Sequence, residues 1–307
     1  MRHLTLAVLL AAGCSGSDAP NPTPTPTPTR PPAVSQSCVV VDEARAVLVL
    51  FGGQSRAGLN AETWTWNGTT WTRASTTGPA ARTGAACAYD SARQRVVLFG
   101  GEGGSARLGD TWEWNGSAWT QRATPGPSAR GFHRLAYDAD RAQTVLFGGS
   151  EGGSVYPAET WTWDGQSWTQ AATAGPAGRF LHAMTFDEGL GRVVLFGGSA
   201  ANPLGDTWEW DGSAWQEVSA TGPGPRDHVN MAADPAHGTL VLFGPVPRET
   251  WIRTGQSWSQ SAALGPEGVS ELATDRSRRR VLLVEGPGAT GGETRLWSWS
   301  GTAWAQQ

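Results

Sequence analysis

The seventeen tryptophans of this chain fall in one phrase that occurs six times along the sequence. The first copy has Trp64, Trp66 and Trp71, and the fifth has Arg253 where the others have a middle tryptophan. The first tryptophans of the copies are Trp64, Trp112, Trp161, Trp208, Trp251 and Trp297, so neighbouring copies lie 43 to 49 residues apart. A fixed period of this size indicates a repeat architecture, in which neighbouring units bury a shared core.

Each repeat contains four short β-favouring segments bounded by Gly, Pro, Asn or Asp. In the second repeat they are residues 85–90, 95–101, 110–114 and 117–120, which we call A, B, C and D. Between C and D the first four repeats have Asn-Gly or Asp-Gly, the dipeptides of a two-residue type I′ turn. This turn predicts that Trp66 pairs with Thr69 and that Trp64 lies across from Trp71.

All three tryptophans of a copy are then expected on one side of the hairpin, because residues i and i+2 share a face. A row of tryptophans also suits carbohydrate binding. Recurrence at the same positions in every copy is, however, what packing between equivalent sheets requires. We therefore interpret the tryptophans as core residues.

Four antiparallel strands repeated six times predict an all-β fold, a six-bladed β-propeller with four-stranded blades. The chain resembles the kelch repeat family in its period and in the hydrophobic run that ends in Gly-Gly, as at Gly52-Gly53, Gly100-Gly101, Gly148-Gly149 and Gly197-Gly198. The resemblance covers residues 34–307. Phe243-Gly244-Pro245 and Val284-Glu285-Gly286 depart from it in blades five and six.

The repeats divide the propeller into whole blades, each beginning with strand A and ending with strand D. No strand is left over to interlock the ends of the chain. We expect blades one and six to meet through side-chain packing, at a seam that opens first. The approximate blade boundaries are 34–74, 75–123, 124–172, 173–219, 220–262 and 263–307.

The N-terminus resembles a bacterial lipoprotein signal. Residues 1–13 have a short basic start and an apolar stretch too short to span a bilayer, and Cys14 follows as the expected lipidated residue. Ala11 stands where that family usually has Leu, and an ordinary secretory signal is the alternative. Residues 14–33 form a Pro/Thr-rich tether that favours extended polyproline II. These features predict a lipoprotein anchored to the bacterial cell envelope, at the outer membrane or cell surface.

The remaining cysteines are Cys38 and Cys87, in the A segments of repeats one and two. Aligned on the Asp that ends each segment, they are one position out of phase. We therefore expect them on opposite faces, as free thiols. Without residues 1–13, 22 arginines face 27 acidic residues, a net charge of −5 that argues against nucleic acid as a partner.

In this architecture the D–A and B–C loops share one end of the propeller, which we call the loop end. The A–B and C–D turns share the other, the turn end. Variable loops on a rigid scaffold are where function concentrates. The loop end also receives residues that we expect to ring the channel mouth as candidate ligand-binding residues, namely Arg82, Arg130, Arg179, Arg226, His133, His182 and His228.

Two readings of these residues remain open. Four converging arginines suit carboxylates or anionic sugars. Alternatively, they pair with the acidic residues two places before the first tryptophan of a copy, which are Glu62, Asp110, Glu159, Asp206 and Glu249. We expect no metal, because ligands from neighbouring blades would have to converge on one ion and His228 lies two residues after its arginine, not three. Arg276, Arg278, Arg279 and Arg280 form a basic turn at the turn end.

The leading functional hypothesis is a monomeric, non-enzymatic binding or scaffold module that holds a protein, peptide or glycan and needs no cofactor. The alternative is an enzyme, since the kelch resemblance includes sialic-acid mutarotases, which need only a few Arg, His and Glu in the channel mouth. Copper-radical oxidases are disfavoured, because Cys87 lies too close to Tyr89 to form their cross-linked pair. A purely structural array is a third possibility, and the fold alone does not decide between them.

Overall fold

The computed structural model describes residues 29–218, 221–268, 270–286 and 294–307. The predicted signal segment, the lipidation site Cys14 and the tether up to residue 28 lie outside the described residues. The regular elements described are all strands, and no helix that could cross a membrane occurs among them.

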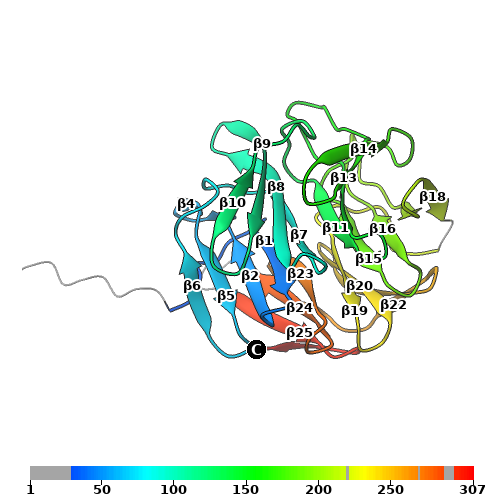
Figure 1. Cartoon of the computed structure of the whole chain (residues 1–307). Coiled ribbons are helices and arrows are strands. Elements are labelled where there is room, and N and C mark those ends of the chain that lie inside the picture. The colour runs from blue at the N-terminus through cyan, green and yellow to red at the C-terminus, as the bar shows by residue number, and fades with distance from the viewer. Residues whose placement is uncertain (1–28, 219–220, 269, 287–293) are drawn as a thin grey trace, which may run out of the picture.

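The strands of the described ranges form six four-stranded antiparallel sheets arranged in a ring, which confirms the predicted six-bladed propeller (Figure 1). Each blade uses strands that follow one another in the sequence. Blades one to three contain, in the order A to D, β1 (Cys38–Asp42), β2 (Val47–Phe51), β5 (Thr63–Trp66) and β6 (Trp71–Ser75); β7 (Ala86–Asp90), β8 (Arg95–Gly103), β9 (Ala106–Trp114) and β10 (Trp119–Arg122); and β11 (Arg134–Asp138), β12 (Gln143–Phe147), β13 (Thr160–Trp163) and β14 (Trp168–Ala172).

The other blades repeat this plan. They contain β15 (Ala183–Asp187), β16 (Arg192–Phe196), β17 (Thr207–Trp210) and β18 (Trp215–Val218); β19 (Asn230–Asp234), β20 (Thr239–Pro245), β21 (Arg248–Thr254) and β22 (Ser257–Ser261); and β23 (Ser270–Asp275), β24 (Arg280–Glu285), β25 (Arg295–Trp299) and β26 (Trp304–Gln306). A small hairpin of β3 (Gln54–Ser55) and β4 (Gly58–Leu59) lies in the first B–C loop.

The ring closes without a shared strand, as expected. The A strands line the central channel, and β23 of blade six contacts β1 of blade one. In Figure 1 the red strands of blade six accordingly lie beside the blue strands of blade one. One apolar cluster joins the two blades, including Val41 and Trp66 from blade one with Leu282 and Leu296 from blade six.

The predicted two-residue C–D turn is wrong. Trp66 pairs with Trp71, and Trp64 pairs with Arg73, so residues 67–70 form a four-residue turn. The Asn67 side-chain oxygen accepts the backbone N–H groups of Thr69 and Thr70, at 3.0 and 2.9 Å. A type I′ turn needs positive φ at both central residues, whereas in this pair only Gly68 has it. The side-chain hydrogen bonds therefore select the longer turn.

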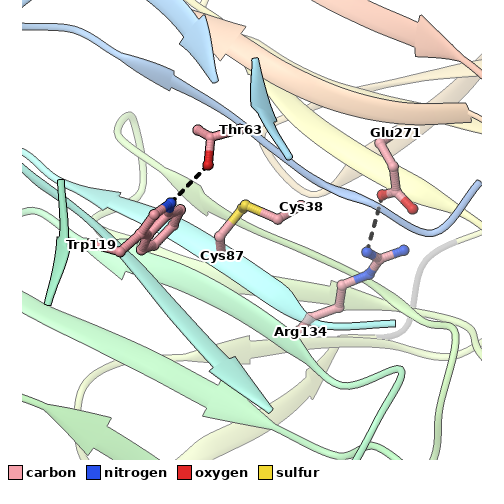
Figure 2. Close-up of a disulfide and its surroundings, with 6 residues drawn as sticks. All are labelled: Cys38, Thr63, Cys87, Trp119, Arg134 and Glu271. Atoms are coloured by element: carbon pink, nitrogen blue, oxygen red, sulfur yellow. Dashed lines mark hydrogen bonds and ion pairs between the residues drawn. A yellow bond between two sulfur atoms is a disulfide. The ribbon is translucent and has the colours of Figure 1, made fainter. Parts of the chain in front are cut away.

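The tryptophans fill the interfaces between blades, as predicted. Trp64, Trp66 and Trp71 belong to one cluster, because the corrected register still places them on one face. In five interfaces the indole N–H of the third tryptophan also donates to a threonine Oγ1 of the preceding blade, as Trp119 does to Thr63 at 2.8 Å (Figure 2). The other pairs are Trp168–Thr111, Trp215–Thr160, Trp258–Thr207 and Trp304–Thr250.

The Gly-Gly pairs are required by a close approach of backbone. Gly100 has φ of 64°, and a Cβ there would lie 2.6 Å from the carbonyl oxygen of Arg130 in the next blade. The N–H of Gly101 donates to that same oxygen at 2.9 Å. The motif thus lets strand B of one blade bind the D–A loop of the next.

Cys38 and Cys87 form a disulfide between β1 and β7, with Cα atoms 5.5 Å apart, so the expectation of two free thiols is wrong (Figure 2). Residues that are one position out of phase point to opposite faces when both lie in the same sheet. Cys38 and Cys87, however, lie in the sheets of neighbouring blades, which face each other. Each blade turns one face to its predecessor and the other to its successor. Residues of opposite phase therefore meet, and Cys38 lies in the same cluster as Ala85, Cys87 and Tyr89.

Candidate functional site at the loop end of the channel

The loop end is built by pairing each D–A loop with a B–C loop of the blade that follows or precedes it. Isolated bridges join Thr83 to Glu102, Gly131 to Ser150 and Phe180 to Ser199. The B–C loops themselves differ. Blade two extends β8 and β9 into a long ribbon, whereas blade five has only a tight turn between β20 and β21. A uniform scaffold thus carries loops of different length.

Three of the four candidate arginines are buried beneath these loops. Arg82, Arg130 and Arg179 are at most 1% exposed. Each donates to the carbonyl oxygen of the first glycine in the Gly-Gly pair of its own blade, at 2.9 to 3.2 Å. Each also pairs with the acidic residue two places before the first tryptophan of its blade, Asp110, Glu159 and Asp206 respectively. These guanidinium groups therefore connect the D–A loop to strands B and C.

The ion pairs lower the pKa values of two of these carboxyl groups. Burial raises the pKa of Asp206, but hydrogen bonds from Arg179 and Trp208 outweigh it, and the net effect lowers the pKa of this carboxyl. The pKa of Asp110 is lowered in the same way by Arg82 and Trp112. Both carboxylates are therefore held in their charged form.

The first and fifth blades vary this arrangement. Arg226 pairs with Glu249 at 2.8 Å, and its side chain is 10% exposed. In blade one the corresponding position is Val34, which is buried, and Glu62 pairs with Arg73 instead. In blade one, where Glu62 already pairs with Arg73, a valine thus replaces the arginine.

His133 and His182 are core residues. Both are at most 1% exposed, and neither ring nitrogen has a hydrogen bond in the described part of the chain. Their rings contact Phe99 and Phe147 edge-on, with centroids 5.4 and 5.8 Å apart. Burial, together with the charge of Arg130 and Arg134, lowers the pKa of His133 to about 3, and burial lowers the pKa of His182 well below its ordinary value.

His228 lies in a different position, as its spacing indicated. It has φ of 53° and occupies the left-handed position that Phe132 and Leu181 occupy in the preceding blades, while Val229 takes the place of the buried histidines. Its side chain is 43% exposed and pairs with Asp227 at 2.8 Å. Of the three candidate histidines, His228 is the one that faces solvent.

The sequence reasoning missed an ion pair that crosses the channel. Arg134 of β11 donates to Glu271 of β23 at 3.1 Å and to the carbonyl oxygen of His182 at 2.8 Å (Figure 2). Burial raises the pKa of Glu271, although the charge of Arg134 opposes this. Both residues, with Asn230, line a small cavity of about 60 Å³. In the sequence, these three residues can be recognised as polar residues four places before the Asp that ends strand A. The other blades have Cys or Ala at this position.

The other end of the channel is also crossed by an arginine. Arg276 pairs with Glu43 of blade one and with Glu188 of blade four. These three residues border a cavity of about 320 Å³ lined by A strands. Arg278 and Arg280 pair with Asp275, and Arg279 donates to the carbonyl oxygen of Pro235, so the basic turn is tied to neighbouring chain.

The described ranges contain no group of three or more His, Cys, Asp or Glu side chains placed to hold a metal ion. The disulfide also engages the Cys87 sulfur, so this thiol is not available for a cross-link to tyrosine.

No family model matches this chain, and no curated protein is similar to it in sequence. Among solved structures it is similar to the structure of YjhT, with a TM-score of 0.72 over 91% of this chain and 99% of that chain. The fold is a kelch-like β-propeller. The two sequences are only 13% identical, so the likeness shows the architecture and not an activity.

Proposed function

We propose that this kelch-like propeller is a binding module that holds a protein, peptide or glycan on its loop end. The observation that carries the proposal is that buried arginine–carboxylate pairs fix loops of different length and chemistry on an otherwise uniform scaffold. Rigid presentation of variable loops lowers the entropy cost of binding. In this proposal Arg82, Arg130 and Arg179 position the loops, and His228 and the partly exposed Arg226 are available to the ligand.

We further propose that the module is exported as a lipoprotein and attached to the cell envelope through Cys14, with the tether as its stalk. The disulfide supports export, because disulfides persist in oxidising compartments. Incorporation of labelled palmitate that is lost in Cys14→Ser tests the anchor. Equal labelling of the variant would overturn it.

The binding proposal is tested by capture of partners from envelope extract of the source organism with a matched pair of variants. Val155 is 54% exposed at the loop end, and Leu190 is 37% exposed at the turn end. We expect Val155→Asp with His228→Ala to lose the captured ligand, and Leu190→Asp to retain it. Equal capture by both variants would move the site away from the loop end.

The ion pair between Arg134 and Glu271 favours a second candidate, an enzyme of the sialic-acid-mutarotase-like kelch type. A guanidinium binds the carboxylate of an anionic sugar. A neighbouring carboxyl whose pKa is raised by burial is better suited to give and take a proton than an ordinary carboxyl. In this reading Arg134 would bind the sugar and Glu271 would be the proton-transfer group.

Proton NMR of a freshly dissolved anionic sugar tests this candidate, because it follows the interconversion of its two anomers. We expect catalysed interconversion by the native chain, loss in Glu271→Gln and retention in Glu188→Gln, which changes a carboxylate at the opposite end of the channel. An uncatalysed rate with the native chain would exclude the enzyme.

A further inference from the structure

The interface that closes the ring lacks a hydrogen bond that the other five possess. In those five the third tryptophan of a blade donates its indole N–H to a threonine of the preceding blade. At the closing interface the tryptophan is Trp71, and the corresponding residue of blade six is Leu296. Leucine has no acceptor, and no other described residue accepts the Trp71 indole N–H. Trp71 therefore has a free donor at the seam.

Trp71 also lines a groove at the seam. The groove has a volume of about 680 Å³, within the range of about 300–1,000 Å³ that is usual for ligand sites. Trp66 and Trp71 line it from blade one, and Leu296 and Gln306 line it from blade six. Two tryptophans and a leucine thus form an apolar surface within a lining that is otherwise mostly threonine, arginine and glutamine, and Trp71 adds an unused donor.

The chain itself enters the propeller at this groove. Thr29 and Arg30, the first described residues, form part of its lining. The carbonyl oxygen of Pro32 then accepts the Thr294 hydroxyl at 2.8 Å, and Val34 is buried in the cluster that joins blades one and six. The segment before Thr29 is therefore joined to the propeller directly beside this groove.

We infer that the proline-rich segment 20–28 docks in this groove as a polyproline II strand. Such a strand has no internal hydrogen bonds, so its carbonyl oxygens are free to accept the Trp71 indole N–H. Proline rings in this conformation bind grooves lined with aromatic side chains. Nine residues span roughly 28 Å at about 3.1 Å each. The segment thus supplies the acceptor that threonine supplies at the other five interfaces.

Docking has a consequence for the stalk. A docked segment leaves fewer residues between Cys14 and the propeller, and it fixes the seam between blades one and six as the point of attachment. The propeller is then held close to its anchor in one orientation, instead of on a fully extended spacer. This consequence rests on the proposed lipid anchor, whereas the docking itself does not.

Hydrogen exchange of tryptophan indole groups, measured by NMR on the full chain, tests the inference. The variant changes Pro22, Pro24, Pro26 and Pro28 to Gly, which removes the polyproline preference. We expect the Trp71 indole to exchange about fivefold faster in the variant, the loss of one hydrogen bond. The Trp119 indole, which is bonded to Thr63, is the internal control for folding and should not change.

Leu296→Thr is the matched second variant, because it gives Trp71 the acceptor of the other interfaces. We expect its Trp71 indole to be protected whether or not the prolines are present. Equal exchange of Trp71 in the native chain and the glycine variant would overturn the inference. Protection that increases with protein concentration would also overturn it, because a second copy would then occupy the groove.

Discussion

At the residue scale, two departures from the repeat keep a buried carboxylate paired with a donor. Arg253 occupies a middle-tryptophan position and is fully buried, and it pairs with Glu209 of the preceding blade. At the corresponding position Trp163 donates to Glu113 at 3.1 Å. In blade six Glu285 accepts the Trp297 indole N–H in place of the missing acidic residue before strand C. A buried carboxylate thus receives a donor in each case.

The buried arginines give the first prediction. Arg179→Leu leaves the partly buried Asp206 without its main partner, and breaking a buried pair in this way costs about 3–5 kcal/mol. Arg226→Leu, at the more exposed pair with Glu249, should cost less. Urea unfolding measures both. A loss below about 1 kcal/mol in Arg179→Leu would contradict a structural role.

The buried histidines predict a pH dependence of stability. The pKa of His133 is lowered to about 3 in the folded chain from 6.5, so below pH 6.5 the unfolded chain binds more protons. The free energy of unfolding is therefore expected to fall as the pH decreases from 6.5 toward 3, by about 1.4 kcal/mol per pH unit for this residue. His133→Phe should reduce that slope in urea unfolding at several pH values. An unchanged slope would contradict the assignment.

At the element scale, the hairpin of strands C and D carries the contacts between blades. The indole N–H of its third tryptophan donates to a threonine in strand C of the preceding blade. A glycine in the D–A loop packs against the ring of the same tryptophan. A Cβ at Gly126 would lie 2.6 Å from the Trp168 ring. Indole, threonine and glycine thus form one repeated contact, which explains their recurrence in the sequence.

This contact gives the third prediction. Thr111 and Trp168 are buried, and their hydrogen bond is 2.8 Å long. Thr111→Val preserves the shape but leaves the indole N–H without an acceptor, which costs about 1–3 kcal/mol. Thr120→Val, at an exposed position of the same blade, is the control and should change stability by less than about 0.5 kcal/mol. Thermal unfolding of the two variants gives the comparison.

At the scale of the whole molecule, the ring is not equally strong at every interface. Blades one and two are joined by the Cys38–Cys87 disulfide and by the Trp119–Thr63 bond. Blades one and six have apolar packing, the Thr294–Pro32 bond, the Arg276–Glu43 ion pair and the contacts of Arg278 with the carbonyl oxygens of Ala46 and Asn67. The seam between blades one and six therefore lacks both the disulfide and the tryptophan–threonine hydrogen bond that join blades one and two.

We accordingly predict that the seam between blades one and six opens first. In hydrogen exchange measured by mass spectrometry, amides of β1 and β24 should exchange before those of β12 and β16 at low denaturant concentration. Reduction of the disulfide should then open the interface of blades one and two as well. Uniform exchange around the ring would contradict this order.

The repeated features of this protein were readable from the sequence. The period of the tryptophans, the β-favouring segments and the Gly-Gly pairs predicted six four-stranded blades and a tryptophan core, because every blade must bury the same faces. The acidic residues two places before the first tryptophan of each copy likewise indicated the partners of Arg82, Arg130 and Arg179.

Features that depend on how blades face one another were decided by the tertiary structure. The disulfide forms because facing sheets bring residues of opposite phase together, and the C–D turn lengthens because Asn67 binds two backbone N–H groups. Arg134 and Glu271 are 137 residues apart and meet only because the closed ring places blades three and six across one channel. The sequence alone determined the repeated unit, and the closure of the ring determined which single residues meet.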